Sequence, residues 1–154
     1  INSGFLLTVY DKNSLLLNSL ISKGALVVNS VEELWENVDH LITCLPTPQI
    51  FYEFAEFAKK YNVDMLELPV TGGVHLAARG KITMLAGGDV NLFRQNYPLL
   101  QAVGDDIFHI GPIGSAAVIK VITNMLAFIY LVADGEALML AKKGWLNLGV
   151  AWQR

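Results

Sequence analysis

Short apolar runs alternate with helix-spaced apolar patterns over residues 1–110 of the chain. The runs have the length and composition of strands, and the longer patterns place apolar residues on one face of a helix. This alternation predicts a mostly parallel sheet covered on both faces by helices, an α/β fold. The predicted strands are Phe5–Tyr10, Ala25–Val28, His40–Leu45, Val63–Leu68, Lys81–Ala86 and Ile107–Ile110. The predicted helices are Asn13–Lys23, a short one capped by Ser30 and Glu33 and ending at Asn37, Ile50–Tyr61, and one opened by Gly87-Gly88-Asp89 and interrupted at Pro98.

The pattern changes after a turn at Gly111–Gly114. An apolar stretch without proline then runs from Ser115 to Lys143 and predicts one long buried helix rather than a strand. We therefore expect a sheet domain over residues 1–112 and a helical domain that begins with residues 113–154. The uncharged part of the helix, Val121–Ala133, is 13 residues long. A membrane span needs ~20 residues, so no membrane association is expected.

Composition and charge narrow the classes of protein and the kinds of site that this chain can have. Hydrophobic residues make up 53% of the 154 residues and charged ones 16%, which indicates a buried core rather than disorder. A net charge of −3 offers no basic surface for nucleic acid. The single cysteine, Cys44, lies in an apolar run and is expected in the core. No two histidines have metal-ligand spacing with a carboxylate, so no metal is expected. A cytoplasmic location is expected, and a mitochondrial one stays open.

Lys120 and Asn124 are the strongly polar residues in the first turns of the predicted long helix. Because they are four residues apart, they share a helix face. A lysine among apolar residues loses hydration, which makes its neutral form accessible, and the amide can hold a substrate oxygen beside it. The pair is a candidate general acid/base with an orienting partner. The alternative is a surface lysine that extends to water beside an ordinary polar residue.

His109, Gly111, Gly114, Lys120 and Asn124 together resemble the signature of the 3-hydroxyisobutyrate dehydrogenase family, the β-hydroxyacid dehydrogenases. In that family a glycine-rich turn leads into the long helix with the catalytic lysine, and an asparagine follows one turn later. The resemblance implies that Lys120 relays the hydroxyl proton and that Asn124 orients the substrate.

The segment Leu68-Pro69-Val70-Thr71-Gly72-Gly73 resembles the Pro-Val-Ser-Gly-Gly loop of the same family, which holds the substrate carboxylate. The resemblance implies this role for Thr71, Gly72 and Gly73. The physical chemistry agrees, since glycines let backbone N–H groups converge on an anion and Thr71 adds a hydroxyl donor. The alternative is a plain Gly-Gly turn between strands.

Three places depart from the family's pattern. Glu67-Leu68 stands where the family commonly shows Asp-Ala. Ala116 replaces a glycine, and Thr123 replaces a second asparagine. None of these changes removes the acid/base group.

Two further segments point to a nucleotide cofactor. Asp11 follows a predicted strand, where a nucleotide-binding sheet places an acid for the ribose 2′-hydroxyl, although an Asp there is more often a turn former. In the family an Asp at this strand favours NAD, while Lys12 leaves NADP as an alternative. Leu45-Pro46 resembles the family's Leu-Pro loop, whose backbone lies against the cofactor.

The phosphate-binding turn Gly-x-Gly-x-x-Gly does not occur in the sequence. The resemblance therefore implies an incomplete Rossmann-like, doubly wound parallel sheet, followed by the first long helix of an all-α C-terminal domain, in a fragment or shortened relative. The implied activity is NAD(P)-dependent hydride transfer involving a small hydroxy acid or semialdehyde, in a protein that forms a homo-oligomer at full length. The rival is a non-catalytic binding or dimerisation module that keeps the fold without the cofactor.

Overall fold

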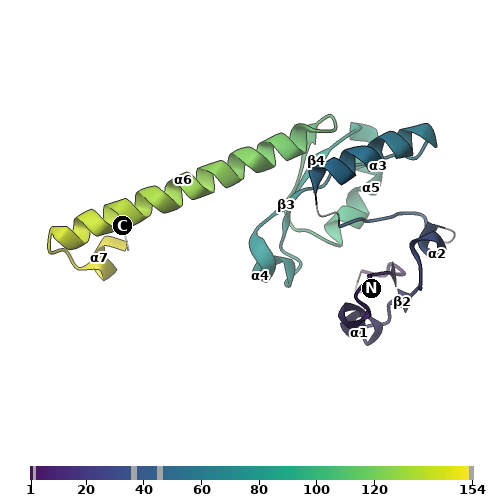
Figure 1. Cartoon of the computed structure of the whole chain (residues 1–154), viewed down its shortest axis with the longest axis horizontal. Helices are drawn as coiled ribbons and strands as arrows, with labels where there is room; N and C mark the ends of the chain where they lie inside the picture. Colours follow the sequence, from purple (N-terminus) through teal and green to yellow (C-terminus); the bar gives the residue numbers. More distant parts are fainter. Residues whose placement is uncertain (2, 36–37, 45–46, 153–154) are drawn as a thin grey trace. The chain divides into compact units, whose positions relative to one another are not determined.

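The computed structural model describes residues 1, 3–35, 38–44 and 47–152. The chain divides into two compact units, Ile1–Phe57 and Ala58–Arg154, which are described one at a time (Figure 1). The division reflects contacts within each unit. The boundary near residue 113, which separates sheet from long helix in the sequence, stays a prediction.

The first unit contains a short parallel pair of strands, β1 (Thr8–Val9) and β2 (Leu26–Val27), with Thr8 opposite Leu26. A 3-10 helix, η1 (Ser14–Leu17), and one α-helical turn, α1 (Asn18–Ile21), connect the two strands. Among the residues of this unit whose burial the structure describes, Leu17 and Ala25 are the buried apolar ones. The predicted β-α-β order is confirmed here, in elements shorter than the sequence pattern suggested.

The predicted cap forms at the next helix, α2 (Val31–Trp35), although the reciprocal bond of the box goes to Asn29 rather than Ser30. The Ser30 hydroxyl accepts a hydrogen bond from the backbone N–H of Glu33, and the Glu33 carboxylate accepts one from Asn29. The strand predicted at His40–Leu45 is wrong for the described residues 40–44, which have no strand partner. Without a neighbouring ladder the apolar run is not buried: Ile42 is 65% exposed, and Cys44 is exposed rather than in the core. Helix α3 (Pro48–Lys60) follows, close to the predicted range.

The second unit is built on a three-stranded sheet in the order β3-β4-β5. The strands are β3 (Val70–Thr71), β4 (Thr83–Gly87) and β5 (Ile107–Gly111). β4 and β5 are parallel, with helix α5 (Val90–Gln101) as their crossover, whereas β3 is antiparallel to β4. The antiparallel pairing was not predicted. It arises because the short connection, including helix α4 (Gly73–Ala77), only reverses the chain, while a parallel pair needs a longer crossover.

Two finer expectations for this unit also differ from the structure. The predicted strand Val63–Leu68 contributes one isolated bridge, between Glu67 and Gly87. Helix α5 runs through Pro98 instead of stopping there. Asp89 begins this helix, and one of its oxygens accepts hydrogen bonds from the backbone N–H groups of Asn91 and Leu92.

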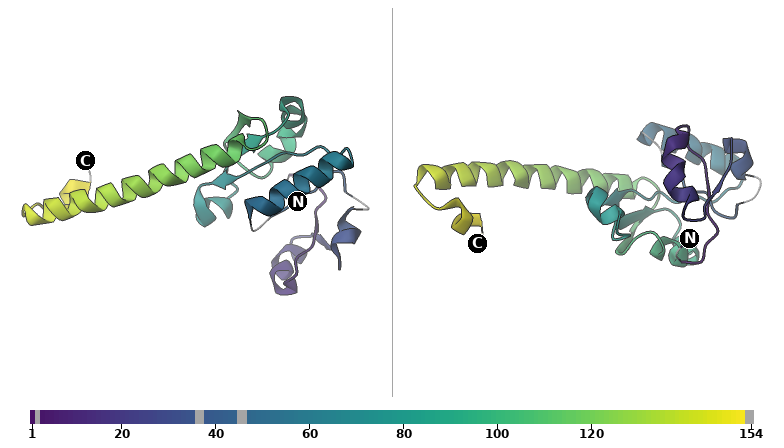
Figure 2. Two further views of the ribbon diagram at one scale, coloured as in Figure 1. Left: turned by 45° about the horizontal axis from the view of Figure 1, so that its top comes forward. Right: turned by 90° about the horizontal axis from the view of Figure 1, so that it is seen from below.

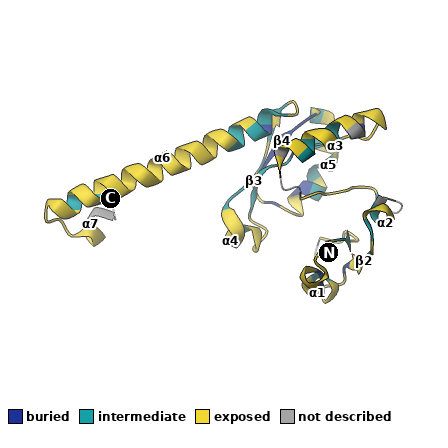
Figure 3. Cartoon of the chain, viewed as in Figure 1, coloured by how far each residue is buried: buried dark blue, intermediate teal, exposed yellow. Residues whose placement is uncertain are grey.

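Helix α6 (Ser115–Lys143) is the long helix that the sequence predicts, with the same bounds. Its first turn packs against β4 and β5, where Ala116 is fully buried. Beyond this turn the helix extends past the sheet (Figure 2), and most of its residues are exposed (Figure 3), so the predicted burial is wrong within this chain. A short helix, α7 (Leu148–Trp152), follows.

Helix α6 is long and apolar enough to cross a membrane, by length and composition alone. Only 6% of the most apolar 18-residue stretch of this helix is buried within the chain. The uncharged stretch, however, is bordered by Lys120 before it and by Asp134 and Glu136 after it. It is therefore shorter than the ~20 residues of a membrane span. The expectation of no membrane association stays a prediction.

Candidate active site at the start of the long helix

The predicted substrate loop lies at one end of the antiparallel pair of strands. Thr71 ends β3, opposite Thr83 of β4, and Gly72 and Gly73 follow it at the start of α4. Their φ angles of 121° and 78° lie in the region that favours glycine. A Cβ on Gly72 would also lie 3.0 Å from Leu76 Cδ1. Both glycines are therefore required by the backbone of this loop.

Lys120 and Asn124 lie on successive turns near the start of α6. Lys120 is half-buried and Asn124 is exposed, so the lysine is less enclosed than an apolar helix suggested. Thr123, one of the departures from the family pattern, donates its hydroxyl proton to the carbonyl oxygen of Lys120 at 2.9 Å. The Thr123 hydroxyl is therefore already hydrogen-bonded within its own helix.

A buried acid connects these two segments. Glu67, only 6% exposed, precedes Thr71 by one short stretch of chain. Its Oε2 accepts a hydrogen bond from the backbone N–H of Gly114 at 2.7 Å, and its Oε1 accepts one from Ala117 at 2.8 Å. The segment that leads into the substrate loop is thus bonded to the first turn of the helix that carries Lys120.

In the sequence Glu67 stands out only as a departure from the family pattern, which does not predict this contact. One signal was present, since Glu67 is one of two acids within the otherwise apolar run Val63–Leu68. An acid in a buried strand needs hydrogen-bond donors. Helix N-termini supply such donors, but nothing in the sequence says which helix lies nearby.

The predicted cofactor residues belong to the first unit. Asp11 is exposed and follows β1, as expected for a ribose-binding acid. Its Oδ1 accepts a hydrogen bond from the backbone N–H of Asn13 at 2.7 Å, so it also acts as a turn former. Leu45 and Pro46 lie outside the described residues. The roles of all these residues stay predictions.

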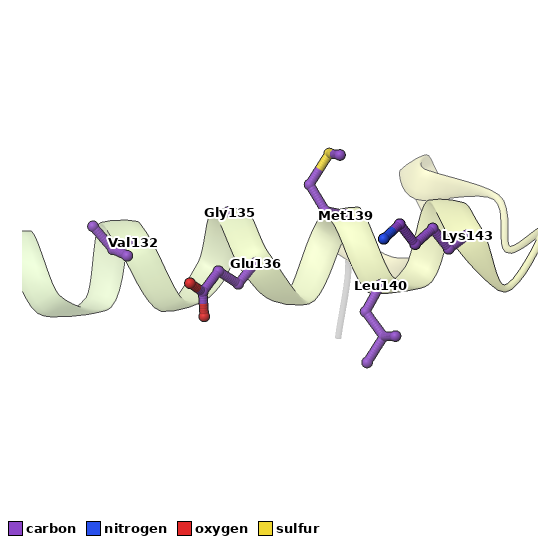
Figure 4. A pocket seen from close by; sticks show the side chains of 6 residues that line it. All are labelled: Val132, Gly135, Glu136, Met139, Leu140 and Lys143. Carbon is purple, nitrogen blue, oxygen red and sulfur yellow. The ribbon is translucent and has the colours of Figure 1, made fainter.

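An open hollow on helix α6 has none of the predicted site residues in its lining (Figure 4). Its lining comes entirely from the far half of α6: Val132, Gly135, Glu136, Met139, Leu140 and Lys143. At 1.5 Å per residue, Val132 lies about 18 Å along the helix from Lys120. The hollow is a depression between exposed side chains and brings together no loop or strand, so we do not assign the chemistry to it. Within the described residues no group of three or more His, Cys, Asp or Glu could hold a metal.

The chain is similar in sequence to several dehydrogenases. Residues 47–111 match a family model described as the NAD binding domain of 6-phosphogluconate dehydrogenase. The NAD-dependent L-serine dehydrogenase of Pseudomonas aeruginosa is 28% identical over 97% of this chain and 61% of its own length. The 3-hydroxyisobutyrate dehydrogenase of the same organism is 35% identical over 71% of this chain and 37% of its own length.

The fold is shared as well. A structure of Mycobacterium tuberculosis 3-hydroxyisobutyrate dehydrogenase with L-serine superposes with a TM-score of 0.89 at 25% identity. The match covers 95% of this chain and 60% of that one. The chain thus spans less than two thirds of the length of each of these three relatives.

Proposed function

Because this chain is a relative of the 3-hydroxyisobutyrate dehydrogenases, a family of NAD-dependent oxidoreductases, we propose that the whole protein oxidises a small 3-hydroxy acid. The reverse reaction, on the corresponding semialdehyde, uses the same groups. The single observation that carries the proposal is the pair of hydrogen bonds that the Glu67 carboxylate accepts from backbone N–H groups at the start of α6. They join the segment of the Thr71-Gly72-Gly73 loop to the helix of Lys120, so that an anion-binding loop and an acid/base group belong to one unit of the fold.

In this proposal Lys120 accepts the proton of the substrate hydroxyl during oxidation and returns it during reduction. Its half-buried position supports this role, since the group keeps access to a substrate and loses part of its hydration. Asn124, one turn later on the same face, donates an amide hydrogen bond to the substrate oxygen. Thr71, Gly72 and Gly73 bind the substrate carboxylate through a hydroxyl and backbone N–H groups.

The residues present fit a nicotinamide dinucleotide. Asp11 offers an exposed carboxylate after the first of two parallel strands, with one oxygen oriented by Asn13, and this is the position where such sheets bind a ribose. We assign NAD as the cofactor, with NADP as the alternative because of the neighbouring Lys12. When bound, the nicotinamide accepts or donates the hydride. For Leu45 and Pro46, which lie outside the described residues, the resemblance implies a contact with the cofactor.

The test is an assay of the whole protein with NAD and with NADP. Candidate substrates are 3-hydroxyisobutyrate and L-serine, each compared with an alcohol of the same shape that lacks the carboxylate. We expect nicotinamide reduction with at least one acid and none with its matched alcohol, because the loop then has no anion to bind. Equal rates for acids and alcohols, or no reduction with either, would contradict the proposal.

The alternative, a non-catalytic binding or dimerisation module without a cofactor, is favoured by one observation. Large apolar side chains on α6 are exposed, including Val121, Phe128 and Leu131 at 67% each. A surface of this kind usually marks an interface. A protein that self-associates strongly but neither binds NAD nor oxidises any acid would support this alternative.

A further inference from the structure

The first turn of α6 lacks a cap from its own sequence. Gly114 begins the helix with a φ of 96°, and this residue has no side chain to bind the free N–H groups. Helices leave their first N–H groups without partners inside the helix. The backbone N–H of Ser115 is bound by the carbonyl oxygen of Pro112. The N–H groups of Gly114 and Ala117 are bound by Glu67, from a distant part of the chain.

Glu67 itself is held firmly. Its backbone exchanges two hydrogen bonds with Gly87 of β4, at 2.8 and 2.9 Å. Its side chain lies close to Gly87. A Cβ at position 87 would be 2.6 Å from Glu67 Oε2 and 3.4 Å from the Ala116 methyl group. The absence of a side chain at position 87 thus lets the carboxylate and the first turn of α6 approach the same strand. The helix dipole adds a favourable field for the negative charge.

We propose that Glu67 is a positioning residue, which fixes the first turn of α6, and hence Lys120, relative to the Thr71-Gly72-Gly73 loop. Ala117, whose N–H it binds, lies just under one helical turn before Lys120. A shift or fraying of this turn would move the lysine relative to the loop. The part of the proposal that concerns Lys120 rests on the proposed function, whereas the anchoring of the helix does not.

The sharpest variant is Glu67→Gln, because it keeps the size and shape of the side chain. Glu67 uses one oxygen for each amide, so the Gln side chain, with one oxygen and one NH2 group, can bind only one of them. The matched control is Asp89→Asn at the start of α5. A single oxygen of Asp89 accepts both of its hydrogen bonds, so the Asn side chain can keep both.

Amide hydrogen exchange of the whole protein, measured over residues 112–120, tests the anchor. We expect exchange in Glu67→Gln to be about tenfold faster or more, as loss of a hydrogen bond to a charged group implies. Asp89→Asn should leave this segment unchanged. Unchanged exchange in Glu67→Gln would overturn the proposal. If that variant does not fold, Glu67→Asp, whose side chain is too short to reach both amides, takes its place and should also exchange faster than the wild type over residues 112–120; unchanged exchange would overturn the proposal.

Kinetics test the positioning of Lys120. We expect Glu67→Gln to lower kcat per folded molecule about tenfold, with the KM for NAD unchanged, because a misplaced proton acceptor affects the reaction step rather than cofactor binding. An effect on the amount of folded protein alone, with normal kcat, would contradict the positioning role. If the wild-type protein oxidises no acid, the proposed function fails, and the exchange comparison still decides whether Glu67 anchors α6.

Discussion

The ring Nε2 of His109 lies 2.9 Å from the carbonyl oxygen of Gly88, 21 positions earlier in the chain. This hydrogen bond connects β5 to the turn between β4 and α5. Gly88 has a φ of 141°, and a Cβ there would lie 2.8 Å from Leu66 Cδ2 and 3.1 Å from the carbonyl oxygen of Met65. The turn beside the parallel strands is therefore fixed both by the histidine and by the absence of a side chain.

Gly88→Ala should lower the free energy of unfolding by about 2 kcal/mol, because the variant combines an unfavourable φ with contacts that are too close. The matched control is Gly135→Ala in α6, where a Cβ would meet nothing within 4 Å. That change should raise stability by about 0.5–1 kcal/mol, as alanine favours a helix over glycine. Chemical denaturation followed by circular dichroism measures both. A Gly88→Ala variant as stable as the wild type would show that the turn can relax.

Lys120→Ala in the whole protein should lower kcat by about 10²–10⁴, the usual contribution of a general acid/base, with little change in cofactor affinity. Lys120→Arg should restore little, because a guanidinium stays protonated. Steady-state kinetics with the best hydroxy acid provide the measurement. Lys143→Ala, at the far end of the same helix, serves as the control and should have normal turnover. More than half of the wild-type kcat in Lys120→Ala would rule out the proton-relay role.

Elements with strong local signals were predicted well from the sequence. The proline-free apolar stretch and the preceding glycine gave α6 with its correct bounds, and the Ser30–Glu33 pair gave the start of α2. These features depend on residues close together in the chain. They need no knowledge of the rest of the fold.

Features that depend on distant partners were predicted poorly. The run His40–Leu45 has the composition of a strand, but strand formation requires a neighbouring ladder that its described residues, 40–44, lack. The direction of β3 and the contact of Glu67 with Ala117 likewise depend on chain reversals. The motifs predict a candidate site at Lys120 and Thr71, while the contact of Glu67 that joins their segments became visible only in the structure.

Thr71→Val tests the substrate loop, because valine keeps the shape of threonine and removes the hydroxyl donor. We expect the KM for the acid to rise about tenfold, the value of one hydrogen bond to a charged group, with NAD affinity unchanged. Thr83 lies directly opposite Thr71 in the sheet, so Thr83→Val is the matched control and should leave this KM unaltered. An equal rise of KM in both variants would indicate a general effect on the strand pair instead of carboxylate binding.

The exposed apolar side chains of α6 should cause the 154-residue chain to self-associate. Phe128 and Leu131 are each 67% exposed and lie three residues apart, so they share a face of the helix. Replacing both by lysine should weaken self-association at least about tenfold, since burying one large apolar side chain contributes about 1.5–3 kcal/mol. Sedimentation velocity measures the change. Leu15→Lys, at an exposed position of η1 in the other unit, is the control and should have no effect.

Flotation with phospholipid vesicles separates this result from membrane binding, since α6 has the length and composition of a span. We expect the wild-type chain to remain with the unbound protein, because Lys120, Asp134 and Glu136 border the uncharged stretch. Co-flotation that the Phe128 and Leu131 substitutions abolish would make the expectation of no membrane association wrong.

Asp11→Asn isolates the cofactor role of this residue from its role in the turn. The Asn side chain retains an oxygen to accept the N–H of Asn13, so the local hydrogen bond of 2.7 Å can persist. The negative charge is lost, however, and with it the charge-assisted hydrogen bond to a ribose hydroxyl. In the whole protein the dissociation constant for NAD should therefore rise about tenfold.

Affinity for NADP should improve relative to NAD in the same variant, because the carboxylate no longer repels a 2′-phosphate beside Lys12. Calorimetric titration with each nucleotide gives the ratio, with Asp39→Asn, another exposed acid of the same unit, as the control. An unchanged preference between NAD and NADP would mean that Asp11 only forms the turn, and that the ribose is bound by other residues.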